Sequence, residues 1–232
     1  MIDWTSIGFI GLGMLLSILL KKLTVTAAIA GGALAVCIYA ASGFPGIVLM
    51  AGFFIIGVAV TSWKKQVKQQ SGLAENMKGK RNAAQVMANA GVPALCCIIA
   101  YLFPQYHLNA PLFVAAAFAS ATADTVSSEL GNVYGSKYYN IVTLKKDNKG
   151  KNGVISLEGT LSGMAGSIII AFIYSIYFGM SIHFVWIIVA GTLGNVADSL
   201  LGATLENRGI LGNNTVNFLN TLVAVLLIIL VQ

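Results

Sequence analysis

Charge is scarce in this chain, in which only 9% of the 232 residues are Asp, Glu, Lys or Arg while 57% are hydrophobic. A soluble domain carries about 25% charged residues, so the composition excludes one. The apolar residues form continuous runs rather than alternating with polar ones, which excludes a transmembrane β-barrel. The composition therefore predicts an all-α, polytopic bundle of transmembrane helices in a lipid bilayer, because backbone groups in lipid must be hydrogen-bonded internally.

Cysteine and histidine are also rare, and the familiar phosphate-binding loops are missing. Cys37, Cys96 and Cys97 lie inside apolar runs without a CxxC pair or a neighbouring histidine, so we expect reduced, inert thiols. His107 and His183 both fall on the expected outer side of the membrane, which argues against histidine chemistry at an inner site. Neither GxxxxGK[ST] nor GxGxxG occurs, so the phosphate-binding loops of soluble enzymes are absent.

The apolar runs predict about eight membrane spans, at residues 4–20, 24–41, 45–62, 83–103, 110–126, 159–178, 182–202 and 214–231. Two breaks between runs are weak. Thr24 follows the first run almost at once, and only Gly43, Pro45 and Gly46 separate the second run from the third. Six or seven crossings therefore remain as alternatives.

The basic residues indicate the orientation of the spans. With eight spans and the N-terminus outside, all 14 Lys and Arg residues, Lys78 among them, fall in inside loops. The positive-inside rule then places both termini outside. The net charge of +6 is accordingly a topology signal, and we expect no nucleic-acid partner. We expect one membrane domain over residues 1–232, with cytoplasmic loops at 63–82 and 131–158, in the plasma membrane of a prokaryote.

Acidic residues gather at the inner ends of two spans, where an ionisable side chain in lipid costs about 2.5–3.5 kcal/mol. Asp124 and Glu129 end the fifth run, and Asp198 and Glu206 end the seventh. Each aspartate lies in an Ala-Asp-Thr/Ser pattern, as in the parallel repeats from which some membrane proteins build a shared site. We therefore expect Asp124 and Asp198 to lie close together.

Helical spacing predicts which polar groups accompany the two aspartates. Ser128 shares a helix face with Asp124, and Asn195 shares one with Asp198. Glu129 follows Asp124 by five residues and is turned away by roughly 140° on a continuous helix. Glu129 joins Asp124 only if the helix ends soon after it.

An acidic residue, a hydroxyl residue and a stripe of glycines lie at the start of the sixth run. Gly159, Gly163 and Gly166 favour close helix packing. The alternative to a packing role is anion binding. Glu158 and Thr160 lie at the N-terminus of this segment, where the helix dipole attracts an anion.

The eighth run begins with several asparagines. Asn213 or Asn214 is the natural N-cap of this helix. Asn217 and Asn220 lie inside the run, however, and capping does not explain them.

These polar groups together suit a metal nucleotide. Carboxylates with waters hold Mg²⁺, while lysines and helix N-termini hold phosphate oxygens. We expect Asp124 and Asp198 to bind the metal ion, with Glu129 as a further catalytic residue. The residues expected to bind substrate or nucleotide are Ser128, Lys145, Lys146, Lys151, Glu158, Thr160, Asn195, Asn214 and Asn217.

Several of these segments resemble the signatures of one membrane protein family, that of transmembrane protein 19 and plant phytyl-phosphate kinase. The similar segments are 121–131 (ATADTVSSELG), 153–160 (GVISLEGT), 198–204 (DSLLGAT) and 216–218 (VNF), within a resemblance from about residue 75 to the end. A more distant likeness is to CTP-dependent phytol and dolichol kinases, whose acidic motif, lysine loop and helix start correspond to 129–131, 145–151 and 158–160.

The resemblance implies transfer of a phosphate from a nucleoside triphosphate, CTP or ATP, to an isoprenoid alcohol or isoprenyl phosphate whose tail lies in the bilayer. A lipid-phosphate cytidylyltransferase would use the same groups. An ion or small-molecule transporter is the alternative from another class, because acidic residues on facing helices also mark cation pathways. The sequence leaves the oligomeric state open.

Overall fold

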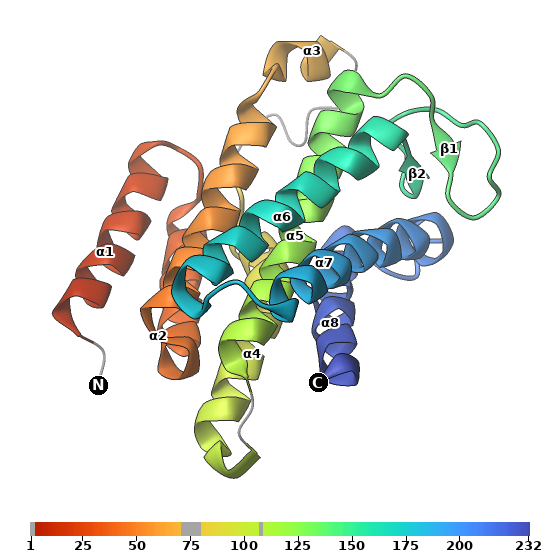
Figure 1. Cartoon of the computed structure of the whole chain (residues 1–232). Helices are drawn as coiled ribbons and strands as arrows, with labels where there is room; N and C mark the ends of the chain where they lie inside the picture. Colours follow the sequence, from red (N-terminus) through yellow and green to blue (C-terminus); the bar gives the residue numbers. More distant parts are fainter. Residues whose placement is uncertain (1–2, 71–79, 107–108) are drawn as a thin grey trace.

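The apolar runs form helices, and the predicted all-α, polytopic bundle is confirmed (Figure 1). The computed structural model describes residues 3–70, 80–106 and 109–232, so Lys78 and His107 lie outside the described residues. Its elements are α1 (Trp4–Leu19), α2 (Val25–Ser62), α3 (Lys65–Gln70), α4 (Ala83–Leu102), η1 (Pro104–Tyr106), α5 (Ala110–Tyr134), β1 (Tyr139–Asn140), β2 (Val154–Ile155), α6 (Leu157–Phe178), α7 (Ile182–Leu201), η2 (Gly202–Glu206) and α8 (Asn213–Val231).

Six helices of the described part are long and apolar enough to cross a bilayer, namely α2, α4, α5, α6, α8 and α7 continued to Glu206. The first of these, α2, bends back on itself at Gly43, whose φ of 62° and ψ of −159° interrupt the helix just before Pro45. The two halves run antiparallel, since Lys22 Nζ, just before α2, donates to Ser62 Oγ at its end, over 2.9 Å. The short break predicted between the second and third runs is therefore real. The number of bilayer crossings, eight, stays a prediction.

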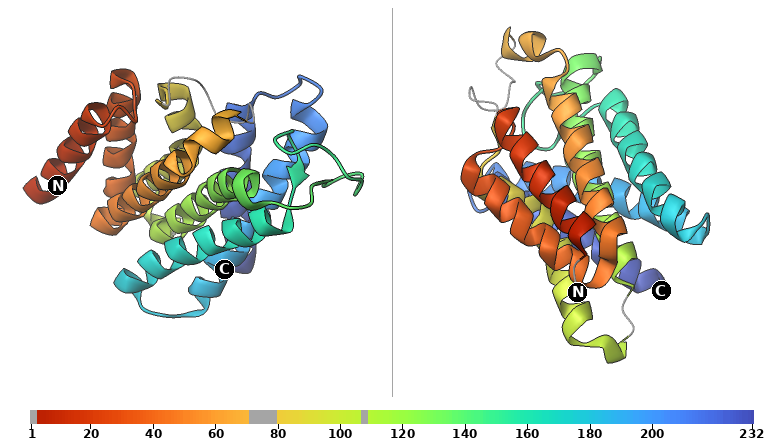
Figure 2. Two further views of the ribbon diagram at one scale, coloured as in Figure 1. Left: turned by 90° about the horizontal axis from the view of Figure 1, so that it is seen from above. Right: turned by 90° about the vertical axis from the view of Figure 1, so that its left-hand side faces the viewer.

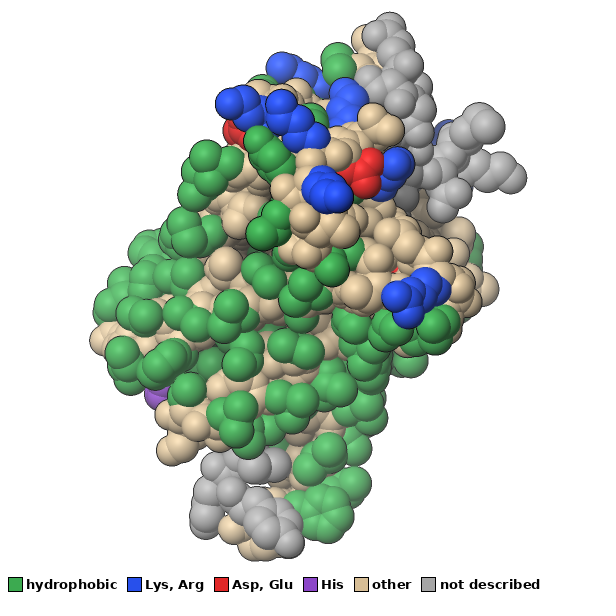
Figure 3. Space-filling view, turned by 90° about the vertical axis from the view of Figure 1, so that its right-hand side faces the viewer, with side chains coloured by type: hydrophobic (Ala, Val, Ile, Leu, Met, Phe, Trp, Pro, Cys, Tyr) green, Lys and Arg blue, Asp and Glu red, His purple; other side chains and the backbone are tan. Residues whose placement is uncertain are grey.

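Polar loops and chain termini lie at opposite ends of the bundle. The β1–β2 hairpin and α3 occupy one end, called here the basic end, and both chain termini lie toward the other (Figures 1 and 2). On the face shown in Figure 3, Lys and Arg side chains gather mainly at the basic end, above a broad hydrophobic surface. This segregation fits the predicted topology, whose sidedness stays a prediction.

The central helix of the bundle is α5, which packs against α2, α4, α6, α7 and α8. Its alanines and the glycines of its neighbours allow close approach, as small residues do between transmembrane helices. A Cβ atom on Gly163 of α6 would lie 2.7 Å from the carbonyl oxygen of Ala123. The predicted packing role of the α6 glycines is confirmed, and this packing holds the inner part of α5 between its neighbours.

Two loop predictions need correction or extension. The fifth run was expected to end at residue 126, but α5 continues to Tyr134, so the first residues of the 131–158 loop are helical. The same loop contains the antiparallel β1–β2 hairpin, which pairs Tyr139 with Ile155 and was not predicted. In the 63–82 loop, residues Lys65–Gln70 form the short helix α3, while residues 71–79 lie outside the described part.

Candidate functional site

A polar cavity of about 450 Å³ lies toward the basic end of the bundle, between α4, α5, α6, α7, α8 and the hairpin. Its volume falls within the range of about 300–1,000 Å³ of small-molecule sites. Eight of the predicted site residues line it: Asp124, Ser128, Glu129, Lys151, Thr160, Asn195, Asp198 and Asn217. Lys145, Lys146, Glu158 and Asn214 do not line it.

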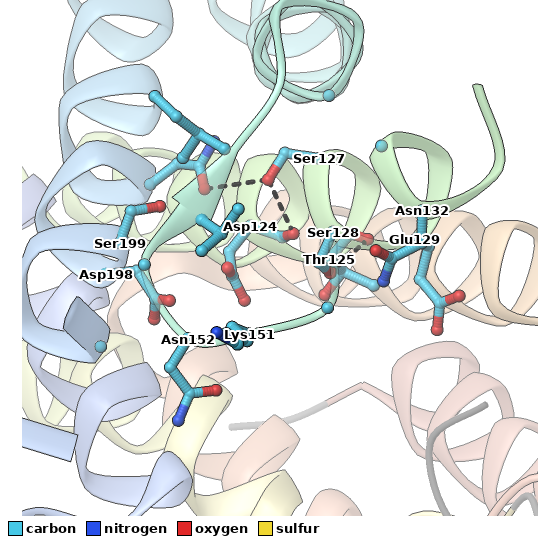
Figure 4. Close-up of a pocket in the computed structure, with 18 of the residues that line it drawn as sticks. Asp124, Thr125, Ser127, Ser128, Glu129, Asn132, Lys151, Asn152, Asp198 and Ser199 are labelled. Atoms are coloured by element: carbon cyan, nitrogen blue, oxygen red, sulfur yellow. Dashed lines mark hydrogen bonds between the residues drawn. The ribbon is translucent and has the colours of Figure 1, made fainter. Parts of the chain in front are cut away.

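Asp124 of α5 and Asp198 of α7 meet in this cavity. The two helices approach closely because a Cβ atom on Gly191 would lie only 2.8 Å from Ala119 Cβ. The Asp124 and Asp198 side chains interact and face each other in Figure 4. The predicted proximity of the two aspartates is confirmed, whereas their role as metal ligands stays a prediction.

A chain of buried amide and hydroxyl groups orients Asp198. Asn220 of α8 is fully buried, and its Nδ2 donates to Asp198 Oδ1 over 2.7 Å. Ser120 Oγ in turn donates to Asn220 Oδ1 over 3.1 Å. Helix capping does not explain the presence of Asn220 inside an apolar run, but its hydrogen bond to Asp198 does. Through this bond from the neighbouring helix α8, Asn220 fixes the direction in which the Asp198 carboxyl group points.

Asn195 is positioned in a similar way from the α5 side. Ser127 Oγ contacts both the Asp124 carbonyl oxygen at 3.1 Å and Asn195 Oδ1 at 3.0 Å (Figure 4). The Asn195 amide nitrogen lies on the α6 side, 3.0 Å from the place that a Cβ atom on Gly163 would take. The hydrogen bond between Ser127 and Asn195 joins α5 and α7 beside the aspartate pair.

The oxygen atoms around the two aspartates suit a hard cation. Two neighbouring carboxylates repel each other when both are ionised, and a bound cation relieves this repulsion. Glu206 of η2, a single π-helical turn, adds a further carboxyl group to the cavity wall, which also includes that of Glu129. Across the described ranges no three His, Cys, Asp or Glu residues form a metal cage. Two carboxylates supplemented by water and phosphate oxygens are nevertheless the usual Mg²⁺ arrangement, so the residues fit this ion.

Glu129 is held by a buried lysine. Lys68 of α3 is 2% exposed and forms an ion pair with the Glu129 carboxylate. The same ammonium group donates to the carbonyl oxygens of Val60 at 3.0 Å and Thr61 at 2.9 Å, at the end of α2. Glu129 therefore joins α5 to α3 and to the C-terminus of α2. A pairing of Glu129 with Asp124 would require α5 to end near Glu129. Because α5 continues to Tyr134, this condition is not met.

Arg81, two residues before α4, lines the cavity, although its place in the sequence indicates only the topology. Its guanidinium group lies over the Phe53 ring, 5.6 Å from the centroid, and fills the space that a Cβ atom on Gly57 would need. Gln85 and Asn89 line the cavity with it. The spacing of four residues among these three polar side chains, beside an otherwise apolar run, was the signal that could have identified them.

The hairpin contributes one lysine to the cavity. Lys151 Nζ donates to Asp147 Oδ1 over 2.7 Å, and this bond, with that from the Asn148 N–H, holds the pKa of Asp147 below its usual value. Asp147 thus stays ionised and keeps Lys151 in place at neutral pH. Lys145 and Lys146 are exposed on the same hairpin.

Tyr138 attaches the hairpin to the end of α5. Its hydroxyl group contacts the carbonyl oxygens of Gly131 and Gly135, each at 2.9 Å, which satisfies acceptors that a helix end leaves open. Burial and, to a smaller extent, the Glu158 carboxylate raise the pKa of Tyr138. The hydroxyl therefore remains protonated and donating at neutral pH.

Two helix N-termini, those of α6 and α8, border the cavity. At the start of α6, Ser156 is the N-cap and accepts from the Gly159 N–H over 3.1 Å, while Thr160 lines the cavity. The Glu158 carboxylate turns to the loop, where it accepts from Ser136 Oγ over 2.5 Å. The positive end of the α6 dipole therefore adjoins the cavity, and its one acidic side chain is engaged elsewhere.

The capping prediction for α8 is wrong. The N-cap is Gly212, without a side-chain bond, rather than Asn213 or Asn214. The helix begins one residue earlier than a capping asparagine would require. This start places Asn213 in the cavity wall with Asn217.

Comparisons with known proteins give a family and several relatives. The profile described as "Integral membrane protein DUF92" matches residues 8–225. An uncharacterized membrane protein of Synechocystis is 32% identical over 191 residues, covering 81% of this chain and 74% of that protein. One of Methanocaldococcus jannaschii is 35% identical over 185 residues, covering 78% and 74%. The chloroplastic protein VTE6 of Arabidopsis thaliana is 30% identical over 200 residues, covering 83% of this chain and 60% of that protein. No solved structure gives a significant match.

Proposed function

The chain belongs to the integral membrane protein family DUF92, and we propose that it transfers a phosphate from a nucleoside triphosphate to an isoprenoid alcohol or isoprenyl phosphate. The observation that carries this proposal is the pair of facing aspartates, Asp124 and Asp198, in a polar cavity within a membrane helix bundle. The family resemblance predicted from the sequence motifs is confirmed, and it implies a lipid acceptor of this kind.

The polar groups of the cavity support the proposal of a metal nucleotide. Asp124 and Asp198 would hold Mg²⁺, with Asn220 keeping Asp198 in position. Mg²⁺ bound there would neutralise charge on the phosphate oxygens, while the acceptor oxygen bonds to the terminal phosphorus and the nucleoside diphosphate leaves with its bridging oxygen. Among the described residues, Arg81 and Lys151 are the basic side chains in the cavity wall, and both suit phosphate oxygens.

Transport is a weaker explanation of the same aspartates. A cation pathway needs polar groups on both sides of the membrane midplane. Residues 112–119 of α5, which lead from the cavity toward the opposite end, are all apolar and buried. The part of the central helix beyond the cavity is therefore closed by packed side chains.

A binding measurement tests the first step of the proposed reaction. Purified protein in detergent is titrated with CTP and with ATP, each with Mg²⁺ or with EDTA. We expect saturable binding of one nucleotide per chain that is lost in EDTA, because the phosphates and carboxylates repel each other without the cation. Failure of both nucleotides to bind in the presence of Mg²⁺ would refute the proposal.

A further inference from the structure

An apolar groove of about 140 Å³ lies between α1, α2 and α4, next to the polar cavity. Its walls include Phe9 and Met14 of α1, Met50 and Phe53 of α2, and Val86 of α4. The helix α1 stands at the edge of the bundle beside α2 in Figure 1 and in the left-hand view of Figure 2. The groove is therefore bordered by the helix that is least enclosed by the rest of the protein.

The groove and the polar cavity share three lining residues, Arg81, Gln85 and Asn89. These residues form the polar end of a surface that is otherwise almost wholly hydrocarbon. Arg81 lies over Phe53, so the guanidinium group touches an apolar wall of the groove while it also borders the cavity. A molecule at this junction would meet a cation on one side and apolar side chains on the other.

Glycines give the groove its width. Gly13 of α1 has no atom within 4 Å of the place where its Cβ would be. A Cβ on Gly31 of α2 would make ordinary contacts, 3.7 Å from Val86 Cγ1 and 4.0 Å from Met50 Cε. Both glycines line the groove, so larger side chains at these positions would occupy it without striking the backbone.

We infer that this groove holds the part of the acceptor's hydrocarbon tail nearest its headgroup, with Arg81 contacting the phosphate or hydroxyl group. The inference rests on the proposed function and assigns the side from which its lipid substrate enters. At about 140 Å³, the groove holds only a short stretch of the tail. The rest of the tail extends past α1 into the bilayer.

Photocrosslinking tests this placement without requiring catalysis. The probe is hexadecyl phosphate with a diazirine on the third carbon from the phosphate, added to protein in phosphatidylcholine nanodiscs without nucleotide. We expect crosslinks in the α1 and α2 peptides that contain Phe9, Met14 and Met50. An excess of hexadecyl phosphate should compete, and phosphatidylcholine carrying a diazirine should not give the same peptides.

Two glycine positions on α1 provide a matched pair of variants. Gly13→Leu fills the groove and should lower crosslinking about tenfold, because small changes of volume in an apolar pocket have effects of this size. Gly11→Leu adds the same side chain to the same helix, also with no atom within 4 Å, but outside the groove, and should leave crosslinking unchanged. Gly31→Val is a second filling variant, on α2, should Gly13→Leu reduce the yield of folded protein.

The outcomes separate this inference from the proposed function. Crosslinks spread evenly over the lipid-facing helices, or equal loss with Gly11→Leu and Gly13→Leu, would overturn the groove assignment. Labelling equally strong with the phosphatidylcholine probe would show bulk lipid rather than a lipid phosphate in the groove, and would also overturn it. Specific crosslinking by a protein that binds no nucleotide would keep the groove and refute the phosphoryl transferase.

Discussion

Replacing Asp198 or Asp124 by asparagine is expected to lower Mg²⁺-dependent phosphoryl transfer by about 10²–10³-fold, the size of effect seen when one preorganised electrostatic group is lost from an active site. The substitution keeps the shape and removes the charge that holds the cation. Folding should persist, because an amide costs less to bury than a carboxylate. The Asn220 amide can still donate to the new carbonyl oxygen at position 198.

The measurement combines kcat/KM for transfer with thermal stability in detergent, so that lost chemistry is distinguished from lost structure. Asp3→Asn is the control, since Asp3 is the N-cap of α1 and lies outside the cavity wall. It should retain the wild-type rate. Wild-type Mg²⁺-dependent transfer in both the Asp124 and Asp198 variants would end the metal hypothesis, and unfolding of both would show that the carboxyl groups are structural.

Replacing Lys68 by methionine is expected to destabilise the protein by about 3–5 kcal/mol, because it leaves the Glu129 carboxylate partly buried without its cation. The Val60 and Thr61 carbonyl oxygens at the end of α2 lose a donor at the same time. Reversible unfolding in mixed micelles, followed by circular dichroism, measures the free energy of unfolding. A change below about 1 kcal/mol, the value of an exposed ion pair, would contradict the buried contact.

The double variant Lys68→Met with Glu129→Gln shows what Glu129 contributes. Neutralising both partners removes the uncompensated charge, so most of the lost stability should return. If Glu129 acts only through this ion pair, the double variant also recovers transfer. Recovered stability without recovered transfer would restore the catalytic role first expected for Glu129.

Local sequence signals predicted the features that depend on neighbouring residues. The apolar runs gave the helices, and the glycines and proline near residue 43 marked the turn inside α2. The repeated Ala-Asp-Thr/Ser pattern brought Asp124 and Asp198 together correctly, because equivalent positions on adjacent helices of like direction reach the same depth.

Features that depend on contacts between distant segments were missed. The ion pair of Glu129 with Lys68 spans 61 residues of chain, and no local pattern indicates it. Arg81 lines both the cavity and the groove, but in the sequence it is one of many basic residues that the topology rule already explains. The cap of α8 was misassigned because a glycine and two asparagines adjoin, and propensity favours asparagine as the cap.

The most direct test of the account is the fate of the terminal phosphate. Purified protein in liposomes is incubated with Mg²⁺ and with CTP or ATP labelled either at the γ-phosphate or at the α-phosphate, together with isoprenoid alcohols and isoprenyl phosphates of several lengths. The account predicts that γ-label, and no α-label, appears in the lipid fraction and that EDTA stops the transfer. Appearance of the α-label in lipid would identify a cytidylyltransferase or related activity, and no label in any lipid would contradict phosphoryl transfer altogether.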